Sequence, residues 1–328
     1  MQGVNVCNYR TGAIVKTRRL GNDGPVLSEI GFGAWAIGGA WQYGWGPVDD
    51  NDSIKAIHTA LDLGINWIDT AAQYGLGHSE KVVGRALRGK REDVFVATKC
   101  GQPWDENGNC RTHAGADSIR KEIEGSLRRL ETDYIDLYQI HWPDWDTPVE
   151  ESWGALAALQ DEGKVRHIGV CNFGVDLMER CEPIRRVQSL QPIYNLLERD
   201  IEREIIPHCV AHSIGVVAYS PMQSGLLSGS FNRASVAPDD WRIVHSEKFR
   251  EPKYSRGLRL VEELRPMASR YNRTVGQLAI SWALMNKAVT SAIVGARNPE
   301  QVRQNVLGAE TLITPEDMSA IEMLLNTQ

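Results

Sequence analysis

The sequence predicts a single-domain α/β protein, a (β/α)8 barrel over residues 1–328. Three observations predict this fold: short apolar segments alternate with amphipathic ones, eight such pairs fit into 328 residues, and no linker or low-complexity tract divides the chain. Strict alternation of strands and helices is typical of a parallel sheet covered by helices, and eight units of this length suit a closed barrel. An open, doubly wound sheet is the alternative.

The predicted strands are eight short apolar segments. Each has three to seven residues, the length of a buried strand rather than of a helix. In chain order they occupy residues 29–32, 65–68, 94–97, 134–140, 165–170, 190–193, 216–218 and 292–294.

The helices between the strands are predicted from capping residues and from apolar residues at helical spacing. Asp50–Asp52 cap the first helix and Gly64 ends it. Thr147–Glu150 has the capping-box pattern with proline at the first helical position, and Asn298 with Pro299 begins a later helix. In chain order the helices span about residues 50–64, 79–87, 119–130, 147–163, 202–212, 255–271 and 275–285, and two more begin at 298 and 314.

Four chemically capable side chains follow successive predicted strands. Asp69 ends the second strand unit, Tyr74 lies in the turn after it, Lys99 follows the third strand and His141 the fourth. These positions meet at one rim of a barrel. One such residue alone is more often a rim group satisfied by the backbone, but four together favour a site. Asp69 and Lys99 could offset each other's burial, and a cation beside a phenol lowers its pKa, so Tyr74 is a candidate general acid.

Seven segments around these residues resemble the aldo-keto reductase superfamily over about residues 18–325. The segments are Gly31–Trp35, Gly64–Gly75, Ala97–Lys99, Asp133–Pro143, Gly163–Phe173, Ala218–Pro221 and Ile293–Arg297. The resemblance implies reversible hydride transfer between a nicotinamide cofactor and a carbonyl compound. It implies Tyr74 as the proton donor and Lys99 as the group that tunes it. Asp69 would be the partner of Lys99, and His141 would orient the carbonyl oxygen.

The resemblance also implies a cofactor site. The implied residues are Asn172 and Gln191 at the carboxamide, Tyr219 stacked on the nicotinamide, Ser220, Met222 and Leu226 near the pyrophosphate, and Arg297, Gln301 and Asn305 at the adenosine end. Arg297 precedes a helix N-terminus, and a guanidinium there can bind a 2′-phosphate with two hydrogen bonds. We therefore expect NADP(H) to be preferred, with NAD(H) as the alternative cofactor and a surface ion pair as the alternative role of Arg297.

One departure from the family concerns Cys171, where relatives usually have serine before the asparagine. A thiol is a weaker hydrogen-bond donor than a hydroxyl. The change predicts either looser cofactor binding or replacement of the contact by a neighbouring residue.

Tryptophans in loops after the strands predict an aromatic pocket. They are residues 35, 41, 45, 104, 142 and 145, of which Trp35 and Trp142 are the principal candidates. Aromatic walls suit apolar carbonyl compounds or the apolar faces of sugar rings. The irregular stretch at 221–254 is a candidate lid or cofactor clasp.

Two other motifs compete with this interpretation. Gly31–Ala36 matches the G-x-G-x-x-A dinucleotide string, but no helical period follows it, so we expect a rim loop. His208, Cys209 and His212 have metal-ligand spacing, but the sequence places no third ligand beyond this helix, so we expect a helix surface and no metal.

Composition excludes several classes of partner. The formal net charge of −6 argues against nucleic acid or an anionic membrane as the main partner. Six cysteines without a C-x-x-C pair, no apolar run of about 18 residues and no secretory signal at the N-terminus predict a reduced, cytoplasmic protein. We predict an NADP(H)-dependent oxidoreductase of small carbonyl compounds or sugars, and the sequence makes no prediction of oligomeric state. The alternatives are a cofactor-sensing subunit of a channel-like partner and a metal-dependent barrel lyase or hydrolase.

Overall fold

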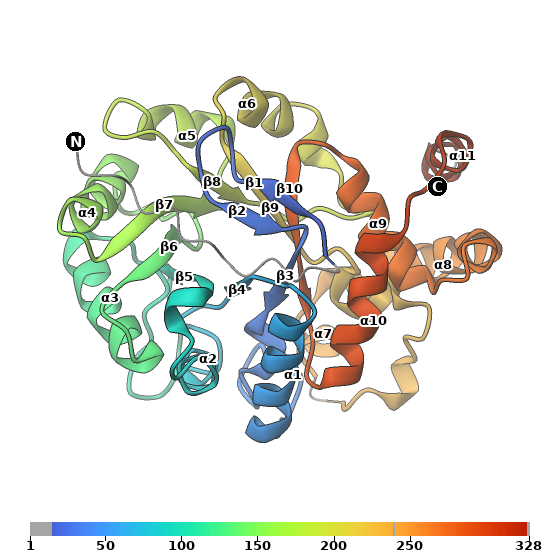
Figure 1. Ribbon diagram of the computed structural model, residues 1–328, viewed down its shortest axis with the longest axis horizontal. Coiled ribbons are helices and arrows are strands. Elements are labelled where there is room, and N and C mark those ends of the chain that lie inside the picture. The colour runs from blue at the N-terminus through green and yellow to red at the C-terminus, as the bar shows by residue number, and fades with distance from the viewer. Residues whose placement is uncertain (1–14, 239, 327–328) are drawn as a thin grey trace.

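A closed barrel of eight parallel strands forms the centre of the computed structural model, which describes residues 15–238 and 240–326 (Figure 1). The strands are β3 (Ile30–Gly33), β4 (Trp67–Asp69), β5 (Phe95–Cys100), β6 (Ile135–Ile140), β7 (Val165–Cys171), β8 (Ser189–Gln191), β9 (Gly215–Tyr219) and β10 (Val289–Gly295). Each pairs in parallel with the next, and β10 closes the ring against β3. All eight predicted strands are confirmed, and the closed ring excludes the open sheet. The N-terminal segment without a predicted signal lies mostly outside the described residues.

Helices surround the barrel in Figure 1. They are α1 (Asp50–Asp62), α2 (His78–Ala86), α3 (Ala116–Leu130), α4 (Val149–Asp161), α5 (Val175–Cys181), α6 (Ile205–Ala211), α7 (Trp241–Val244), α8 (Lys253–Arg270), α9 (Val275–Met285), α10 (Pro299–Glu310) and α11 (Pro315–Asn326). None of the helices in the described part of the chain is both long and apolar enough to cross a membrane.

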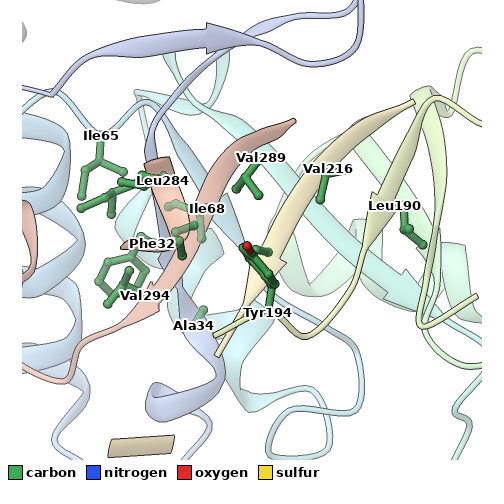
Figure 2. Close-up of a cluster of buried hydrophobic side chains, with 14 of the residues drawn as sticks. Phe32, Ala34, Ile65, Ile68, Leu190, Tyr194, Val216, Leu284, Val289 and Val294 are labelled. Atoms are coloured by element: carbon green, nitrogen blue, oxygen red, sulfur yellow. The ribbon is translucent and has the colours of Figure 1, made fainter. Parts of the chain in front are cut away.

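Alternate residues of each strand face the helices and build the larger core. Phe32, Ile68, Val216 and Val294 lie in this layer, and Leu284 of α9 packs with them from the helical side (Figure 2). The four strand residues are at most 3% exposed. Burying an aliphatic or aromatic side chain of this size contributes about 1.5–3 kcal/mol, so this layer is the main stabilising contact between barrel and helices.

Two helix starts differ from the prediction by about one residue. Asp49, rather than Asp50–Asp52, caps α1 by accepting hydrogen bonds from the Asn51 and Asp52 amides. Pro148 lies at the N-cap of α4 and makes no side-chain cap, so the predicted capping box is absent there. The start of α10 agrees with the prediction, because the Asn298 side chain accepts from the Gln301 amide.

A hairpin that the sequence did not predict closes the N-terminal end of the barrel. It consists of β1 (Thr17–Arg19) and β2 (Val26–Ser28), paired antiparallel. Leu20 and Leu27 pack inside the barrel against Trp67 and Phe95, the first residues of β4 and β5. β1 is Thr-Arg-Arg and has no apolar run, so the sequence contains no signal for this hairpin. The helix α5 has seven residues, too few to show a helical period, and it was not predicted either. Among the described residues, the hairpin fills the N-terminal end of the barrel and leaves the C-terminal ends of the strands open.

Candidate active site

The inward-facing residues at the C-terminal strand ends build the centre of the site. Side chains alternate along a strand. Trp67 and Phe95 point into the barrel, so Asp69 and Lys99, two and four residues further on, point the same way. Because β4 and β5 are neighbours, the two side chains meet beneath the rim. The sequence expectation that these two residues lie together is therefore met by the geometry.

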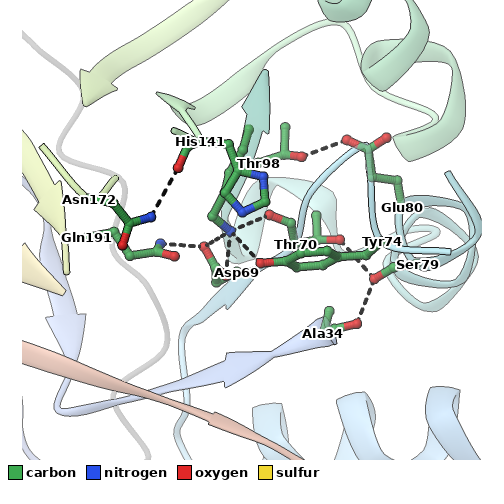
Figure 3. A network of polar contacts seen from close by, with 11 residues as sticks. Ala34, Asp69, Thr70, Tyr74, Ser79, Glu80, Thr98, His141, Asn172 and Gln191 are labelled. Carbon is green, nitrogen blue, oxygen red and sulfur yellow. Dashed lines mark hydrogen bonds and ion pairs between the residues drawn. The ribbon is translucent and has the colours of Figure 1, made fainter. Parts of the chain in front are cut away.

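Lys99 joins Asp69 and Tyr74 into one network. Figure 3 shows Asp69, Tyr74 and His141 gathered around this network. Lys99 Nζ donates to Asp69 Oδ1 at 2.8 Å and Oδ2 at 2.7 Å, and to the Thr70 carbonyl at 2.8 Å. It also lies 3.2 Å from the Tyr74 hydroxyl. The ring of His141 meets that of Tyr74 edge-on, with centroids 5.8 Å apart. The structure thus brings together all four residues predicted to carry the chemistry.

Burial decides the protonation of this cluster. Lys99 and Asp69 are only 1% and 3% exposed. Burial raises the pKa of Tyr74 to about 12, although the Lys99 charge opposes the rise. The sequence-based expectation that Lys99 brings the net pKa of the phenol below its ordinary value is wrong for this structure, because desolvation outweighs the single cation. Tyr74 therefore carries its proton at neutral pH.

The neighbouring groups are also fixed in one protonation state. Burial by itself would lower the pKa of Lys99. The charge of Asp69, with smaller contributions from other neighbouring groups, outweighs burial, so the pKa of Lys99 lies above its usual value. Burial, and then the Lys99 charge, hold the pKa of His141 well below its ordinary value. Lys99 is therefore a cation and His141 a neutral imidazole at neutral pH, with one N–H to donate.

Three amide and phenol groups extend the network from the cluster. Gln191 Nε2 donates to Asp69 Oδ1 at 2.8 Å. Asn172 Nδ2 donates to the His141 carbonyl at 3.1 Å, and the Tyr219 hydroxyl donates to Asn172 Oδ1 at 2.9 Å. The three residues from β8, the end of β7 and β9 are thereby held in fixed orientations beside the catalytic candidates.

A cavity of about 960 Å³ opens above this network. Most residues predicted for the site line it: Trp35, Asp69, Tyr74, His141, Trp142, Asn172, Gln191, Tyr219, Ser220, Met222, Gln301 and Asn305. Three predicted residues do not line it. Lys99 and Leu226 are buried in the protein, and Arg297 is half-buried outside the lining. The Arg297 guanidinium donates to the Trp45 carbonyl at 3.3 Å, and within the described residues it forms no ion pair.

The lining residues fit an extended ligand with a polar end group and a charged end. The Asn172 and Gln191 amides and the Tyr219 ring lie at the catalytic end, whereas Gln301 and Asn305 lie on the first turns of α10. A helix N-terminus attracts phosphate. Lys248, which was not predicted from the sequence, also lines the cavity, and burial lowers the pKa of its ammonium group. The amides and aromatic ring at one end of the cavity and the N-terminus of α10 at the other end together suit a nicotinamide dinucleotide.

Cys171 lies below the cavity rather than in its wall. It is the last residue of β7 and is 1% exposed. Burial raises the pKa of its thiol, and the charge of Lys99 only partly opposes the rise. Cys171 is thus a neutral residue packed beside the Lys99 cluster.

Loops from β3 and β9 meet over the cavity and supply its aromatic walls. The Trp35 ring lies 5.4 Å from that of Trp45 and 5.2 Å from that of Trp241, between centroids. Trp241 begins α7 within the segment predicted as a lid, and it too was missed. Of the other predicted wall residues, Trp41 and Trp142 line the cavity, whereas Trp104 and Trp145 do not. Trp145 is 80% exposed, so proximity to a strand end did not place it in the wall.

The two competing motifs take ordinary structures. Ala34–Ile37, in the G-x-G-x-x-A string, is a single 3-10 turn at the rim. His208 on α6 and His212 just after it have tilted rings with centroids 4.0 Å apart. The expected helix surface is wrong for His208 and Cys209, which are buried on the side of α6 that faces the protein. Within residues 15–238 and 240–326, no group of three or more His, Cys, Asp or Glu side chains is placed to hold a metal ion.

The chain is similar to proteins of one family over almost its whole length. Residues 29–326 match the Aldo/keto reductase family. The aldo-keto reductase YhdN of Bacillus subtilis is 38% identical over 309 residues, covering 93% of this chain and 92% of the relative. The NADH-specific methylglyoxal reductase of Escherichia coli is 37% identical over 313 residues, covering 91% and 94%. The glycerol dehydrogenase AKR11B4 from Gluconobacter oxydans has a solved structure with a TM-score of 0.84 and 40% identity, covering 95% of each chain.

Proposed function

The chain belongs to the aldo/keto reductase family, and from this premise we propose that it interconverts small carbonyl compounds and alcohols with NADP(H) as the preferred cofactor. We also propose that residues 1–328 form one catalytic domain that acts in the cytoplasm. The observation that carries the proposal is the contact of the buried Lys99–Asp69 pair with the Tyr74 hydroxyl, at the base of a large cavity.

The chain's own residues would manage the proton. When bound, the reduced nicotinamide supplies a hydride, with its two electrons, to the carbonyl carbon. Tyr74, protonated at neutral pH, would give its proton to the carbonyl oxygen, which becomes the hydroxyl of the alcohol. Lys99 would stabilise the phenolate left behind until water returns the proton. His141 would donate its N–H to the same oxygen and stabilise the charge that develops there.

The cofactor would be held by residues from several strand ends. Asn172 and Gln191 would bind the carboxamide, and Tyr219 would pack on the nicotinamide ring. At the other end, Arg297 stands just before the N-terminus of α10 without an ion-pair partner among the described residues. A guanidinium in that position favours a ligand with a 2′-phosphate. The Escherichia coli relative is NADH-specific, so cofactor preference needs its own measurement.

The decisive experiment is the Tyr74→Phe variant. Wild-type protein is first screened for NADPH oxidation and NADP reduction against aldehydes, ketones, quinones and free sugars. Tyr74→Phe removes only a hydroxyl, so turnover should fall by roughly 10²–10⁴-fold while cofactor binding, measured by tryptophan fluorescence, stays unchanged. Near-normal turnover would remove Tyr74 from the reaction.

The same measurements separate the alternatives raised from the sequence. A cofactor-sensing subunit would bind the cofactor tightly and turn over no carbonyl in the wild-type protein. A metal-dependent lyase or hydrolase would lose its activity on treatment with a chelator, which the proposed reductase would withstand.

A further inference from the structure

The turn that carries Tyr74 has a backbone conformation that side chains disfavour. It lies between β4 and α2, and the three residues after Tyr74 are Gly75, Leu76 and Gly77, with φ angles of +61°, +52° and +91°. A Cβ atom at Gly75 would lie 1.9 Å from the Gly38 carbonyl oxygen, so the turn packs directly on the loop after β3. A residue such as Leu76 keeps a left-handed conformation only where surrounding contacts fix it. The position of Tyr74 therefore depends on the contacts that hold this turn.

Ser79, in the first turn of α2, holds the far end of this turn. Its hydroxyl donates to the Ala34 carbonyl at 2.8 Å and lies 2.9 Å from Thr70 Oγ1 (Figure 3). Because a hydroxyl has one hydrogen, Thr70 is the donor in the second contact. The Ser79 amide donates to the Tyr74 carbonyl at 3.1 Å. Ser79 and Thr70 are 0% exposed, so water does not compete for these hydrogen bonds. Ser79 thus links the main chain of Tyr74 to the ends of β3 and β4.

Glu80 binds the same turn of α2 to the strand that carries Lys99. Its carboxylate accepts from Thr98 Oγ1 at 2.6 Å (Figure 3) and from Arg129 Nε of α3 at the same distance. Glu80 and Thr98 are also 0% exposed. Thr98 precedes Lys99 in β5, and the Thr70 carbonyl accepts from Lys99 Nζ at 2.8 Å. The start of α2 and Lys99 are therefore fixed relative to each other.

Resting on the proposed function, we infer that Ser79 and Glu80 are positioning residues for the transfer of the Tyr74 proton to the carbonyl oxygen. Neither residue lines the cavity, so neither touches the substrate or the cofactor. Both act by keeping the Tyr74 hydroxyl 3.2 Å from Lys99 Nζ and in place to donate its proton.

Removing the Ser79 hydroxyl shows why the position of this turn matters. Without it, the turn loses its links to Ala34 and Thr70, and the left-handed residues after Tyr74 relax. The Tyr74 hydroxyl then moves relative to Lys99 and to the carbonyl oxygen. Displacing a reacting group by 1 Å costs about a hundredfold in rate. The loss falls on the chemical step, because the residues that line the cavity keep their places.

The test measures Ser79→Ala with the carbonyl compound that gives the highest wild-type turnover. We expect kcat to fall by about tenfold to a hundredfold, while the KM for this compound and the affinity for NADPH stay unchanged. The kcat is calculated per NADPH-binding site, counted by tryptophan fluorescence. A variant that is merely less stable loses binding sites but keeps its kcat per site, so this measurement separates positioning from stability.

Matched variants complete the comparison. Ser53 on α1 is also 0% exposed, its hydroxyl donates to the Asp49 carbonyl at 2.9 Å, and it does not line the cavity. Ser53→Ala should therefore keep the wild-type kcat. Thr98→Val removes the donor to Glu80 with little change in volume, and it should lower kcat with KM unchanged. This variant tests the inference even if Ser79→Ala does not fold.

A double variant shows whether Ser79 acts through Tyr74. In Tyr74→Phe/Ser79→Ala, the second substitution should not lower the residual turnover of Tyr74→Phe any further, measured with protein in excess over substrate. An equal further loss in both backgrounds overturns the inference and leaves the reductase assignment intact. A wild-type kcat in folded Ser79→Ala, or in Thr98→Val if Ser79→Ala does not fold, has the same consequence. Failure of every carbonyl compound to support cofactor oxidation overturns the proposed function and this inference with it.

Discussion

Replacing Lys99 with methionine removes the cation at the centre of the site while keeping most of the side-chain volume. In the wild type, Lys99 Nζ lies within 3.2 Å of both Asp69 carboxylate oxygens, the Thr70 carbonyl and the Tyr74 hydroxyl. In Lys99→Met, the Asp69 carboxylate stays 3% exposed in its present surroundings and has Gln191 as its remaining side-chain donor. The variant therefore leaves a buried charge without its counterion.

The expected loss of stability follows from that unpaired charge. Breaking a buried ion pair by removing one partner costs about 3–5 kcal/mol. A chain of 328 residues unfolds with an entropy of about 0.7 kcal/mol/K near its midpoint. The Tm should therefore fall by about 4–7 °C. Turnover should fall by at least about a hundredfold, because the phenolate of Tyr74 loses the charge that stabilises it.

Thermal unfolding followed by circular dichroism measures the stability effect, and steady-state kinetics measures turnover. The matched control is the double variant Lys99→Met/Asp69→Asn, which removes both charges and should recover most of the lost Tm without recovering turnover. An unchanged Tm in Lys99→Met, or a double variant as unstable as the single one, would show that the ion pair does not hold this cluster together. Unchanged turnover would refute the role of Lys99 in the reaction.

Three further predictions concern the cofactor, the pH response and the barrel floor. Arg297→Ala should weaken NADP(H) binding about tenfold to a hundredfold, because it removes a hydrogen bond to a charged phosphate. NAD(H) binding should stay unchanged in fluorescence titrations, and an equal loss of affinity for both cofactors contradicts this prediction. Burial raises the pKa of Glu122 to about 7 from 4.5, so the protonated carboxyl stabilises the folded state at low pH. This stabilisation declines as pH rises through about 7, and the total loss is up to about 3 kcal/mol. Glu122→Gln should therefore flatten the pH dependence of guanidinium unfolding, and parallel pH profiles would count against the argument. Leu27→Ala, at the filled end of the barrel, should cost about 2–5 kcal/mol, whereas Val26→Ala, at a 37% exposed neighbour, should cost under about 0.5 kcal/mol.

The sequence by itself determined the barrel and the four candidate catalytic residues. The strands are continuous apolar runs, because both faces of a parallel strand are buried, and such runs are visible without knowledge of the fold. Asp69 and Lys99 could be placed together because they end adjacent strands, and the ends of parallel strands meet at one rim. Tyr74 and His141 follow from the same rule.

Only the tertiary structure decided the walls of the site and its protonation. Trp241 and Lys248 come from a stretch without periodicity, so their place in the cavity depends on how that stretch folds over the barrel. Gln73 and Gln102 are 29 residues apart and meet through the folded loop after β5. The pKa of Tyr74 rises because the phenol is buried, and the effect of burial on this pKa is larger than the opposing effect of the Lys99 charge. Local pattern reports which strand end a residue occupies, whereas contact between loops and the degree of desolvation are properties of the packed chain as a whole.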